Sequence, residues 1–158
     1  MHGTNVVTGI VVAAVVLGGC ASAPPPRTEA ISVPGGWPLP SGLAVVTSSF
    51  AEARGLRHHQ GLDLAAPEGT PVLATADGIV TLAERSGDSG RLVVIRHGGG
   101  WETRYAHLRR IGVERGQRVA RGEQIGTVGR SGNASGAHLH YEVRCDGLPL
   151  DPWPTLRR

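Results

Sequence analysis

Apolar and polar residues alternate near the C-terminal end of this chain in the manner of a β-strand. The segment 138–144 reads HLHYEVR, so that every second residue is apolar. Successive side chains of a strand point to opposite faces, and residues two apart therefore share a face. We expect His138 and His140 to lie side by side on one face, while Leu139 points the other way, toward a core.

Similar short runs, separated by turn residues, fill most of the chain before this segment. We expect strands at residues 44–50, 72–75, 79–83, 92–95, 101–108 and 125–128. The hairpin formed by 92–95 and 101–108 should place Thr103, Tyr105 and His107 on one face. No segment past the N-terminus shows sustained helical periodicity. The predicted fold is therefore all-β, a compact antiparallel sheet or sandwich of about eight to ten short strands with glycine-rich loops around a groove.

A second polar cluster occupies residues 59–63. His59 and Asp63 are four residues apart, a spacing that fits one face of a helix. Gly61 inside the cluster and Pro67 just after it argue against a helix. We predict a loop that enters a short strand, in which Gly61 lets the backbone turn so that both polar side chains reach one site.

The N-terminus has the pattern of a targeting segment. Residues 6–17 form an apolar run too short to span a bilayer comfortably, and residues 17–20 read LGGC. This end resembles the lipobox of bacterial lipoproteins, in which the signal peptidase cuts before a cysteine that is then lipidated. We expect a signal peptide at residues 1–19 and lipidation of Cys20; an ordinary cleaved signal ending near Ala21 or Ala23 is the alternative.

The lipobox resemblance implies a place in the cell envelope. The protein would be held to the membrane by an N-terminal lipid anchor, and Ser22 would permit sorting to the outer membrane, facing the periplasm, in a Gram-negative host. Residues 20–42 are rich in proline and read as an extended linker. The folded domain is then expected to cover residues 43–158.

Composition narrows the class of function. Among 158 residues, 24 glycines and 11 prolines with 18% charged residues favour a turn-rich β protein. The 16 basic residues are all arginine and exceed the 13 acidic ones, which favours anionic surroundings. No basic run carries interleaved aromatics, so nucleic acid is not an expected partner. A carrier domain of the lipoyl type would need a modifiable lysine, and the chain has none.

The two cysteines do not form a disulfide framework in this interpretation. If Cys20 carries lipid, Cys145 has no partner within the chain. Cys145 follows the strand at 138–144 and is interpreted as structural. No serine or cysteine lies in a nucleophile motif.

The histidines suggest a metal site. A catalytic zinc ion takes three protein ligands and keeps a position open for water. His59, Asp63 and one of the paired histidines could supply the three ligands, and nearby imidazoles could transfer protons. Spacing alone does not say which histidine has which role. His58 is expected to be an exposed neighbour of His59, and His97 to be structural or part of the groove.

The motifs together resemble those of the lysostaphin-type (LytM-type) zinc endopeptidases. The resemblance rests on three segments with polar residues, 59–63 (HQGLD), 103–108 (TRYAHL) and 138–142 (HLHYE), and on the framing segments 66–72, 76–80 and 122–126. It covers residues 46–152, essentially the whole predicted domain. The family often has a glycine after the phenylalanine at position 50, whereas this chain has Ala51, and Arg54 comes one place late.

The resemblance implies a ligand set and a reaction. It assigns zinc to His59, Asp63 and His140, and catalytic roles beside the attacking water to His107 and His138. The implied activity is hydrolysis of peptide bonds in peptidoglycan stems or cross-links. The alternative is a non-catalytic LytM-type module that activates a separate cell-wall amidase, as part of division; such members lack metal ligands. Because all five positions are intact here, the enzyme is the favoured prediction.

Overall fold

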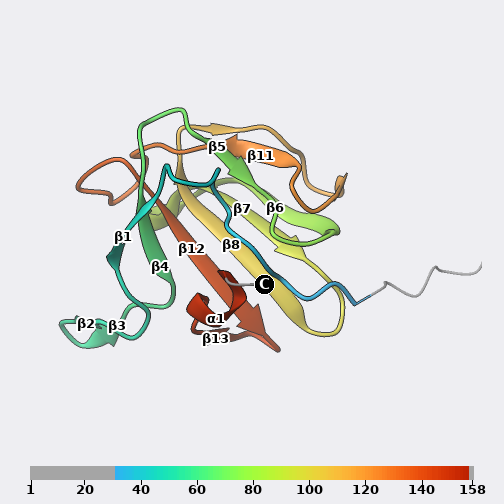
Figure 1. Ribbon diagram of the computed structural model, residues 1–158, viewed down its shortest axis with the longest axis horizontal. Helices are drawn as coiled ribbons and strands as arrows, with labels where there is room; N and C mark the ends of the chain where they lie inside the picture. The colour runs from blue at the N-terminus through green and yellow to red at the C-terminus, as the bar shows by residue number, and fades with distance from the viewer. Residues whose placement is uncertain (1–30, 157–158) are drawn as a thin grey trace, which may run out of the picture.

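The computed structural model describes residues 31–156, and almost all of its regular structure is β (Figure 1). This confirms the predicted all-β class. The thirteen strands are β1 (Val45–Ser48), β2 (Ala53–Arg54), β3 (Arg57–His58), β4 (Leu62–Ala65), β5 (Pro71–Leu73), β6 (Gly78–Ser86), β7 (Gly90–Arg96), β8 (Trp101–Leu108), β9 (Arg110–Ile111), β10 (Arg118–Val119), β11 (Gln124–Thr127), β12 (His138–Cys145) and β13 (Leu148–Leu150). The excess over the predicted number comes from β2, β3, β9 and β10, which are two residues long.

The strands form one large and two small antiparallel sheets. The eight-stranded sheet has the order β1-β4-β12-β8-β7-β6-β10, with β13 beside the end of β12. A three-stranded sheet has the order β5-β11-β9, and β2 pairs with β3 as a separate hairpin. A short 3-10 helix, η1 (Gly87–Ser89), connects β6 to β7, and α1 (Trp153–Leu156) follows β13. No helix within residues 31–156 is long and apolar enough to cross a membrane.

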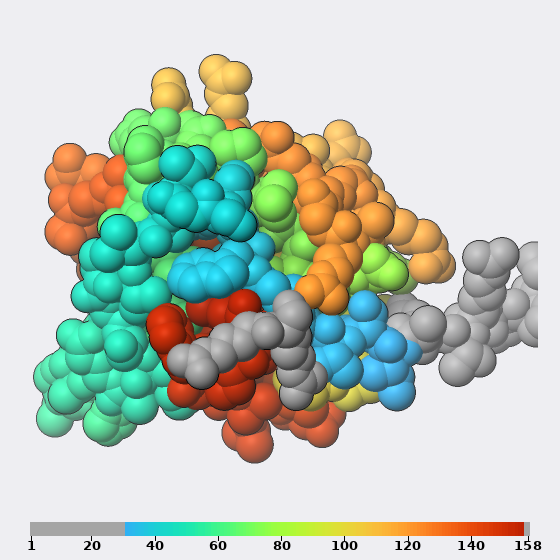
Figure 2. Space-filling model, viewed as in Figure 1, coloured from blue at the N-terminus to red at the C-terminus, as the bar shows by residue number. Residues whose placement is uncertain are grey.

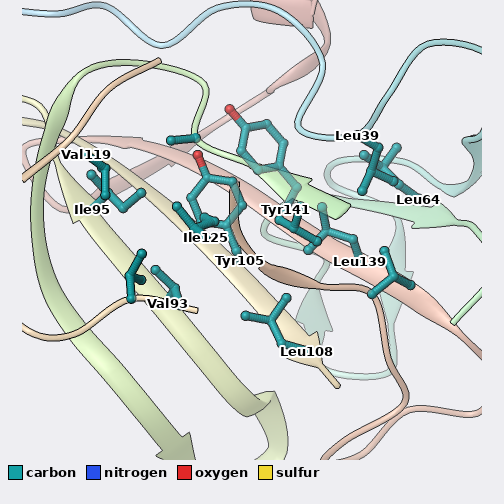
Figure 3. Packing of buried hydrophobic residues seen from close by; sticks show 14 of the residues in the cluster. Leu39, Leu64, Val93, Ile95, Tyr105, Leu108, Val119, Ile125, Leu139 and Tyr141 are labelled. Atoms are coloured by element: carbon teal, nitrogen blue, oxygen red, sulfur yellow. The ribbon is translucent and has the colours of Figure 1, made fainter. Parts of the chain in front are cut away.

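The main core lies between the eight-stranded and three-stranded sheets (Figure 3). Leu64, Tyr105 and Tyr141 come from the large sheet, whereas Val72 and Ile125 come from the small one, and all five are fully buried. Burial of large apolar side chains contributes about 1.5–3 kcal/mol each. One face of the large sheet is thus fixed by packing, and its opposite face carries a second, small apolar cluster of Leu92, Val94 and Ala106 beside the polar residues.

Residues 31–42, which the sequence analysis places in a linker, lie along the domain. Leu39 is 2% exposed and belongs to the main core, and the carbonyl oxygen of Pro38 accepts the backbone N–H of Leu73. Farther toward the N-terminus, the backbone N–H of Gly36 donates to Thr155 in α1. In the space-filling view this segment lies against the C-terminal residues (Figure 2). Its hydrogen bonds and the burial of Leu39 make it a strap on the core side of the fold.

Candidate metal centre

The alternation predicted for residues 138–144 is confirmed in β12. Leu139 is fully buried in the core, and His138 and His140 point to the opposite face of the sheet. In the antiparallel pairing of β12 with β4, His140 lies directly opposite Asp63. Such cross-strand pairs have Cβ atoms about 4.5–5.5 Å apart. The register of the sheet therefore joins the two polar motifs, which are far apart in the sequence.

His59 reaches the same point from the loop that precedes β4. The chain must pass very close to β12 here, because a Cβ atom on Gly61 would lie 2.2 Å from the carbonyl oxygen of Tyr141. Only glycine allows this approach of two backbones. Gly61 is not among the residues with positive φ. Its function is therefore to make room for β12, and not the backbone turn that the sequence suggested.

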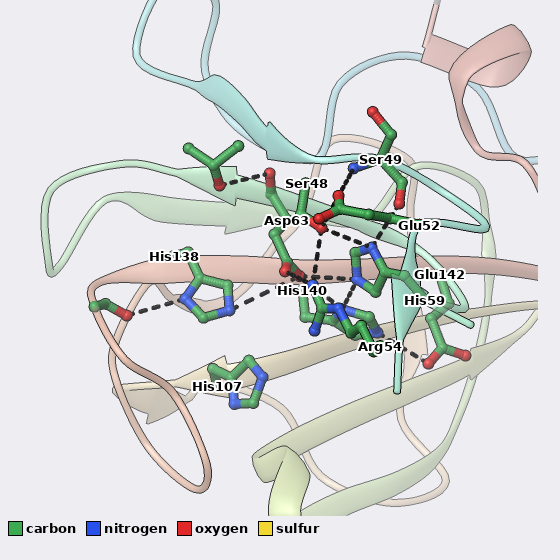
Figure 4. A network of polar contacts seen from close by, with 12 residues as sticks. Ser48, Ser49, Glu52, Arg54, His59, Asp63, His107, His138, His140 and Glu142 are labelled. Carbon is green, nitrogen blue, oxygen red and sulfur yellow. Dashed lines mark hydrogen bonds and ion pairs between the residues drawn. The ribbon is translucent and has the colours of Figure 1, made fainter. Parts of the chain in front are cut away.

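The three predicted ligands converge on one point (Figure 4). His59 Nε2 is 3.1 Å from Asp63 Oδ1 and 3.0 Å from His140 Nδ1, and His140 Nδ1 is 2.8 Å from Asp63 Oδ1. Ligand atoms about 2.0–2.1 Å from a tetrahedral zinc ion lie about 3.3 Å from one another. The group fits zinc after an outward shift of a few tenths of an ångström. No fourth histidine, cysteine or carboxylate of residues 31–156 joins this group.

Hydrogen bonds on the far side of the two ligand imidazoles determine which nitrogen faces the site. His59 Nδ1 donates to the carbonyl oxygen of Ser49 at 2.8 Å. His140 Nε2 donates to Glu142 Oε1 at 3.0 Å. These bonds leave His59 Nε2 and His140 Nδ1 to present lone pairs to a metal, as in other histidine metal sites.

His107 and His138 stand beside the three ligands, with ring centroids 4.7 Å apart. His107 Nδ1 donates to the carbonyl oxygen of Ser131 at 2.8 Å, and His138 Nδ1 donates to that of Gly136 at 2.9 Å. His138 Nε2 is 3.8 Å from Asp63 Oδ1. Each of the two imidazoles thus keeps Nε2 for proton transfer near the ligand group.

The path by which His107 reaches this face differs from the prediction. His107 has φ +61°, a left-handed backbone conformation that is uncommon for residues other than glycine. The register between β7 and β8 shifts at this point, which is the sign of a bulge. Leu108 consequently joins Tyr105 in the core, and His107 turns toward His138. The expectation that His107 shares a face with Thr103 and Tyr105 is therefore wrong.

Electrostatics favour an ionised Asp63. Burial by itself raises the pKa of Asp63, but hydrogen bonds from His140, His59 and Arg54 outweigh it and hold the pKa far below the ordinary value of 3.8. Burial lowers the pKa of His140, yet hydrogen bonds with Asp63 and Glu142 raise it to about 9. In the metal-free protein His140 is thus a cation at neutral pH, and metal binding at Nδ1 displaces a proton.

Two residues of the site had no role in the sequence analysis. Glu142 accepts from His140 and from Arg144 Nε at 2.8 Å; its position two residues after His140 on the same strand could have revealed it. Arg54 Nη2 contacts Asp63 Oδ2, and nothing in the sequence indicated this contact. Among the other histidines, His58 is exposed, as expected, and His97 is buried at 1% exposure.

Comparisons with known proteins agree with this geometry. The sequence model of peptidase family M23 matches residues 57–152, which is more than half of the chain. The chain is 51% identical over 96 residues to the DD-carboxypeptidase/endopeptidase Mpg of Neisseria meningitidis, a match that covers 61% of this chain and 22% of Mpg. It is 45% identical over 93 residues to the peptidoglycan DD-endopeptidase ShyA of Vibrio cholerae, covering 59% of this chain and 22% of ShyA.

A solved structure shows the same fold. The crystal structure of a zinc-containing peptidase from Vibrio cholerae superimposes with a TM-score of 0.71 at 34% sequence identity, covering 76% of this chain and 39% of that one. The matches to Mpg and ShyA span only about a fifth of the length of those relatives.

Proposed function

Because the chain belongs to peptidase family M23, we propose that it is a zinc-dependent endopeptidase that hydrolyses peptide bonds in peptidoglycan. The observation that carries the proposal is the convergence of His59, Asp63 and His140 within hydrogen-bonding distance of one another, with His107 and His138 beside them. We assign the first three as zinc ligands and the last two as catalytic residues. The names of Mpg and ShyA support cross-links of the DD type as the substrate.

In the proposed mechanism the protein holds the substrate and moves protons. A bound zinc ion supplies an acidified water and polarises the scissile carbonyl. Burial lowers the pKa of His107, so that its Nε2 is an unprotonated base at neutral pH. His107 and His138 can each accept the proton of the attacking water at Nε2. Once protonated, either imidazole can donate to the oxyanion or to the leaving amine.

A groove beside the metal centre gives the substrate access to two of the proposed zinc ligands, His59 and His140. It has a volume of about 700 Å³ and is lined by His59, His140 and Glu142, and by Arg54 and Leu56 of the β2–β3 hairpin. The strap at 31–42 lies on the core side of the large sheet, where it forms its hydrogen bonds and buries Leu39. The intact group of three ligands, with His107 and His138 beside it, supports the enzyme over a non-catalytic module that activates an amidase.

The function is tested with protein expressed without residues 1–20, so that the strap is kept. We expect about one zinc ion per chain by metal analysis, and new cleaved cross-links from isolated peptidoglycan by mass spectrometry. Both should be lost in His140→Ala. Zinc without cleavage of any wall type would contradict the endopeptidase. Absence of zinc from the wild-type protein would contradict the metal assignment itself.

We also propose that Cys20 is lipidated and holds the enzyme in the cell envelope, an assignment that lies outside the described residues. Its support is the lipobox-like segment 17–20. Cys20→Ser should move the full-length protein from the membrane fraction to the soluble fraction of the producing cell. Cys145→Ser is the matched control and should leave the distribution unchanged. Equal distribution of the wild type and Cys20→Ser would contradict the anchor.

A further inference from the structure

Arg54 connects the β2–β3 hairpin to the metal centre. Its Nη2 contacts Asp63 Oδ2 and donates to Ser48 Oγ at 2.9 Å. Ser48 Oγ in turn donates to Glu52 Oε2 at 2.6 Å, and the backbone N–H of Ser49 donates to the same carboxylate oxygen at 3.1 Å. These bonds hold the guanidinium against the end of β1 and the loop that follows it (Figure 4). Arg54 is therefore held at Asp63 by hydrogen bonds to Ser48. The two nitrogens that face the metal position, His59 Nε2 and His140 Nδ1, take no part in these bonds.

The two oxygens of Asp63 have different partners. Oδ1 faces the two ligand histidines, at 3.1 Å from His59 Nε2 and 2.8 Å from His140 Nδ1. The Arg54 contact is the hydrogen bond that the structure shows for Oδ2. Asp63 is only 7% exposed, so without Arg54 its second oxygen would be a largely buried charged acceptor that has lost its partner. The carboxylate could then rotate and offer both oxygens to a metal.

We propose that Arg54 is a positioning residue that occupies Asp63 Oδ2 and so presents Oδ1 as a single-oxygen ligand to the metal. The inference rests on the proposed zinc site. It adds that the hairpin must hold Arg54 at Asp63 Oδ2 for the metal to bind normally. Partners of ligating carboxylates and histidines typically change metal affinity or activity 10–100-fold when removed. The β2–β3 hairpin thus has a second function beside forming the groove wall, because its position determines how Asp63 binds.

Charge repulsion acts in the opposite direction and must be separated from positioning. A guanidinium near a divalent cation disfavours metal binding, so its removal would on this ground tighten zinc. The side chain of Arg54 is 47% exposed, and solvent weakens such a through-space effect. Arg57 lies opposite Arg54 in the hairpin pairing and is also exposed. Arg57→Ala removes the same charge from the same hairpin without removing the contact with Asp63, and so controls for the net charge of the hairpin.

The experiment compares Arg54→Ala, Arg54→Lys and Arg57→Ala in the protein without residues 1–20. Zinc affinity is measured by competition with a chelating dye, and the cobalt-substituted protein is examined by visible absorption, whose intensity falls as coordination number rises. We expect Arg54→Ala to weaken zinc binding about 10–100-fold and to reduce the cobalt absorption. Arg54→Lys should recover part of both losses, because the ammonium keeps the charge without the planar fork. Arg57→Ala should stay within about twofold of the wild type.

The outcomes separate this inference from the proposed function. Thermal melting of the metal-free variants checks that each is folded, and the Lys variant supplies the test if the Ala variant is not. Wild-type zinc affinity and cobalt absorption in folded Arg54→Ala would overturn the positioning role while leaving the metal site intact. An equal effect of Arg57→Ala would also overturn it. Failure of the wild-type protein to bind zinc or cobalt would overturn both.

Discussion

The strands β8 and β12 carry a polar network on each of their two faces, and the networks differ in kind. On the core face, neutral hydrogen bonds join hydroxyl groups and one imidazole in a row: between His97 Nε2 and Thr103 (2.7 Å), Thr103 and Tyr105 (3.0 Å), Tyr105 and Thr75 (3.1 Å), and Thr75 and Tyr141 (2.9 Å). All five residues are at most 1% exposed. On the groove face, ionised groups and imidazoles surround a point where a metal fits.

The difference shows how one sheet separates stability from reactivity. A buried polar network stabilises a fold when each member has a partner, and it has nothing left for a ligand. The groove-face imidazoles instead each use one nitrogen for a carbonyl or carboxylate partner and keep the other for the site. Substitutions on the core face should therefore change the free energy of unfolding, and substitutions on the groove face should change metal binding or rate.

The largest effect is expected from His138→Ala on the groove face. Loss of one proton-transfer group lowers kcat/KM about 10²–10⁴-fold, or roughly 3–5 kcal/mol of barrier. Zinc content should remain close to one per chain, because His138 is not among the three converging ligands. Steady-state rates on a purified muropeptide dimer, with metal analysis of the same sample, test this. Loss of zinc in this variant would mean that the two histidines of β12 are assigned in the wrong order.

Tyr105→Phe breaks the core-face network. The change removes the hydroxyl that contacts the backbone N–H and Oγ1 of Thr75 and the Oγ1 of Thr103. We expect the free energy of unfolding to fall by about 1–3 kcal/mol in urea denaturation. Zinc affinity should not change. Tyr141→Phe affects the same threonine, so the double variant should lose less than the sum of the two single losses. Strict additivity would contradict a shared network.

His97 should give the core face a dependence on pH. Burial lowers the pKa of His97 below its ordinary value of 6.5, against the opposing effect of the Asp77 carbonyl. The unfolded chain therefore binds a proton more readily than the folded one. The contribution of His97 to the free energy of unfolding is fully present above pH 6.5 and is lost as pH falls through the lower pKa of the folded state. Urea midpoints of the wild type should fall more between pH 7.5 and 5 than those of His97→Gln; equal slopes would contradict this.

The smallest effect concerns backbone strain on the groove side. Ala51 has φ +62°, a conformation that costs an L-residue about 1–2 kcal/mol. Ala51→Gly should raise the free energy of unfolding by about 0.5–1 kcal/mol, since the added flexibility of glycine offsets part of the relief. Ala53→Gly, two residues on in β2, lies outside the positive-φ positions and should be destabilising. Thermal melting of both variants decides the comparison.

Much of the candidate site could be predicted because its residues follow local rules. The period of two in β12 fixes which face His138 and His140 occupy, and it does so without knowledge of any other strand. The motif around His59 and Asp63 identified two more converging residues, and the resemblance to a family selected His140 over His138 as the third. The predicted strand at 101–108 matches β8 in its bounds.

Other features depended on contacts that the local pattern does not encode. The bulge at His107 reverses its face because the paired strands β7 and β8 differ by one residue at that point. The segment 31–42 has the composition of a free linker, yet Leu39 finds an apolar site between sheets that exists only after they assemble. Arg54 reaches Asp63 only through a side-chain contact between the β2–β3 hairpin and β4.

By itself, then, the sequence determined the all-β class, the two histidines on one face of a strand and the residues that could hold zinc. Side-chain alternation and residue chemistry are properties of a few neighbouring positions, and they survive in any fold built from those strands. The tertiary structure alone decided how His107 arrives at the site, what holds the second oxygen of Asp63 and that residues 31–42 pack on the domain. Each of these depends on contacts between different elements of the fold, and no local pattern specifies such contacts.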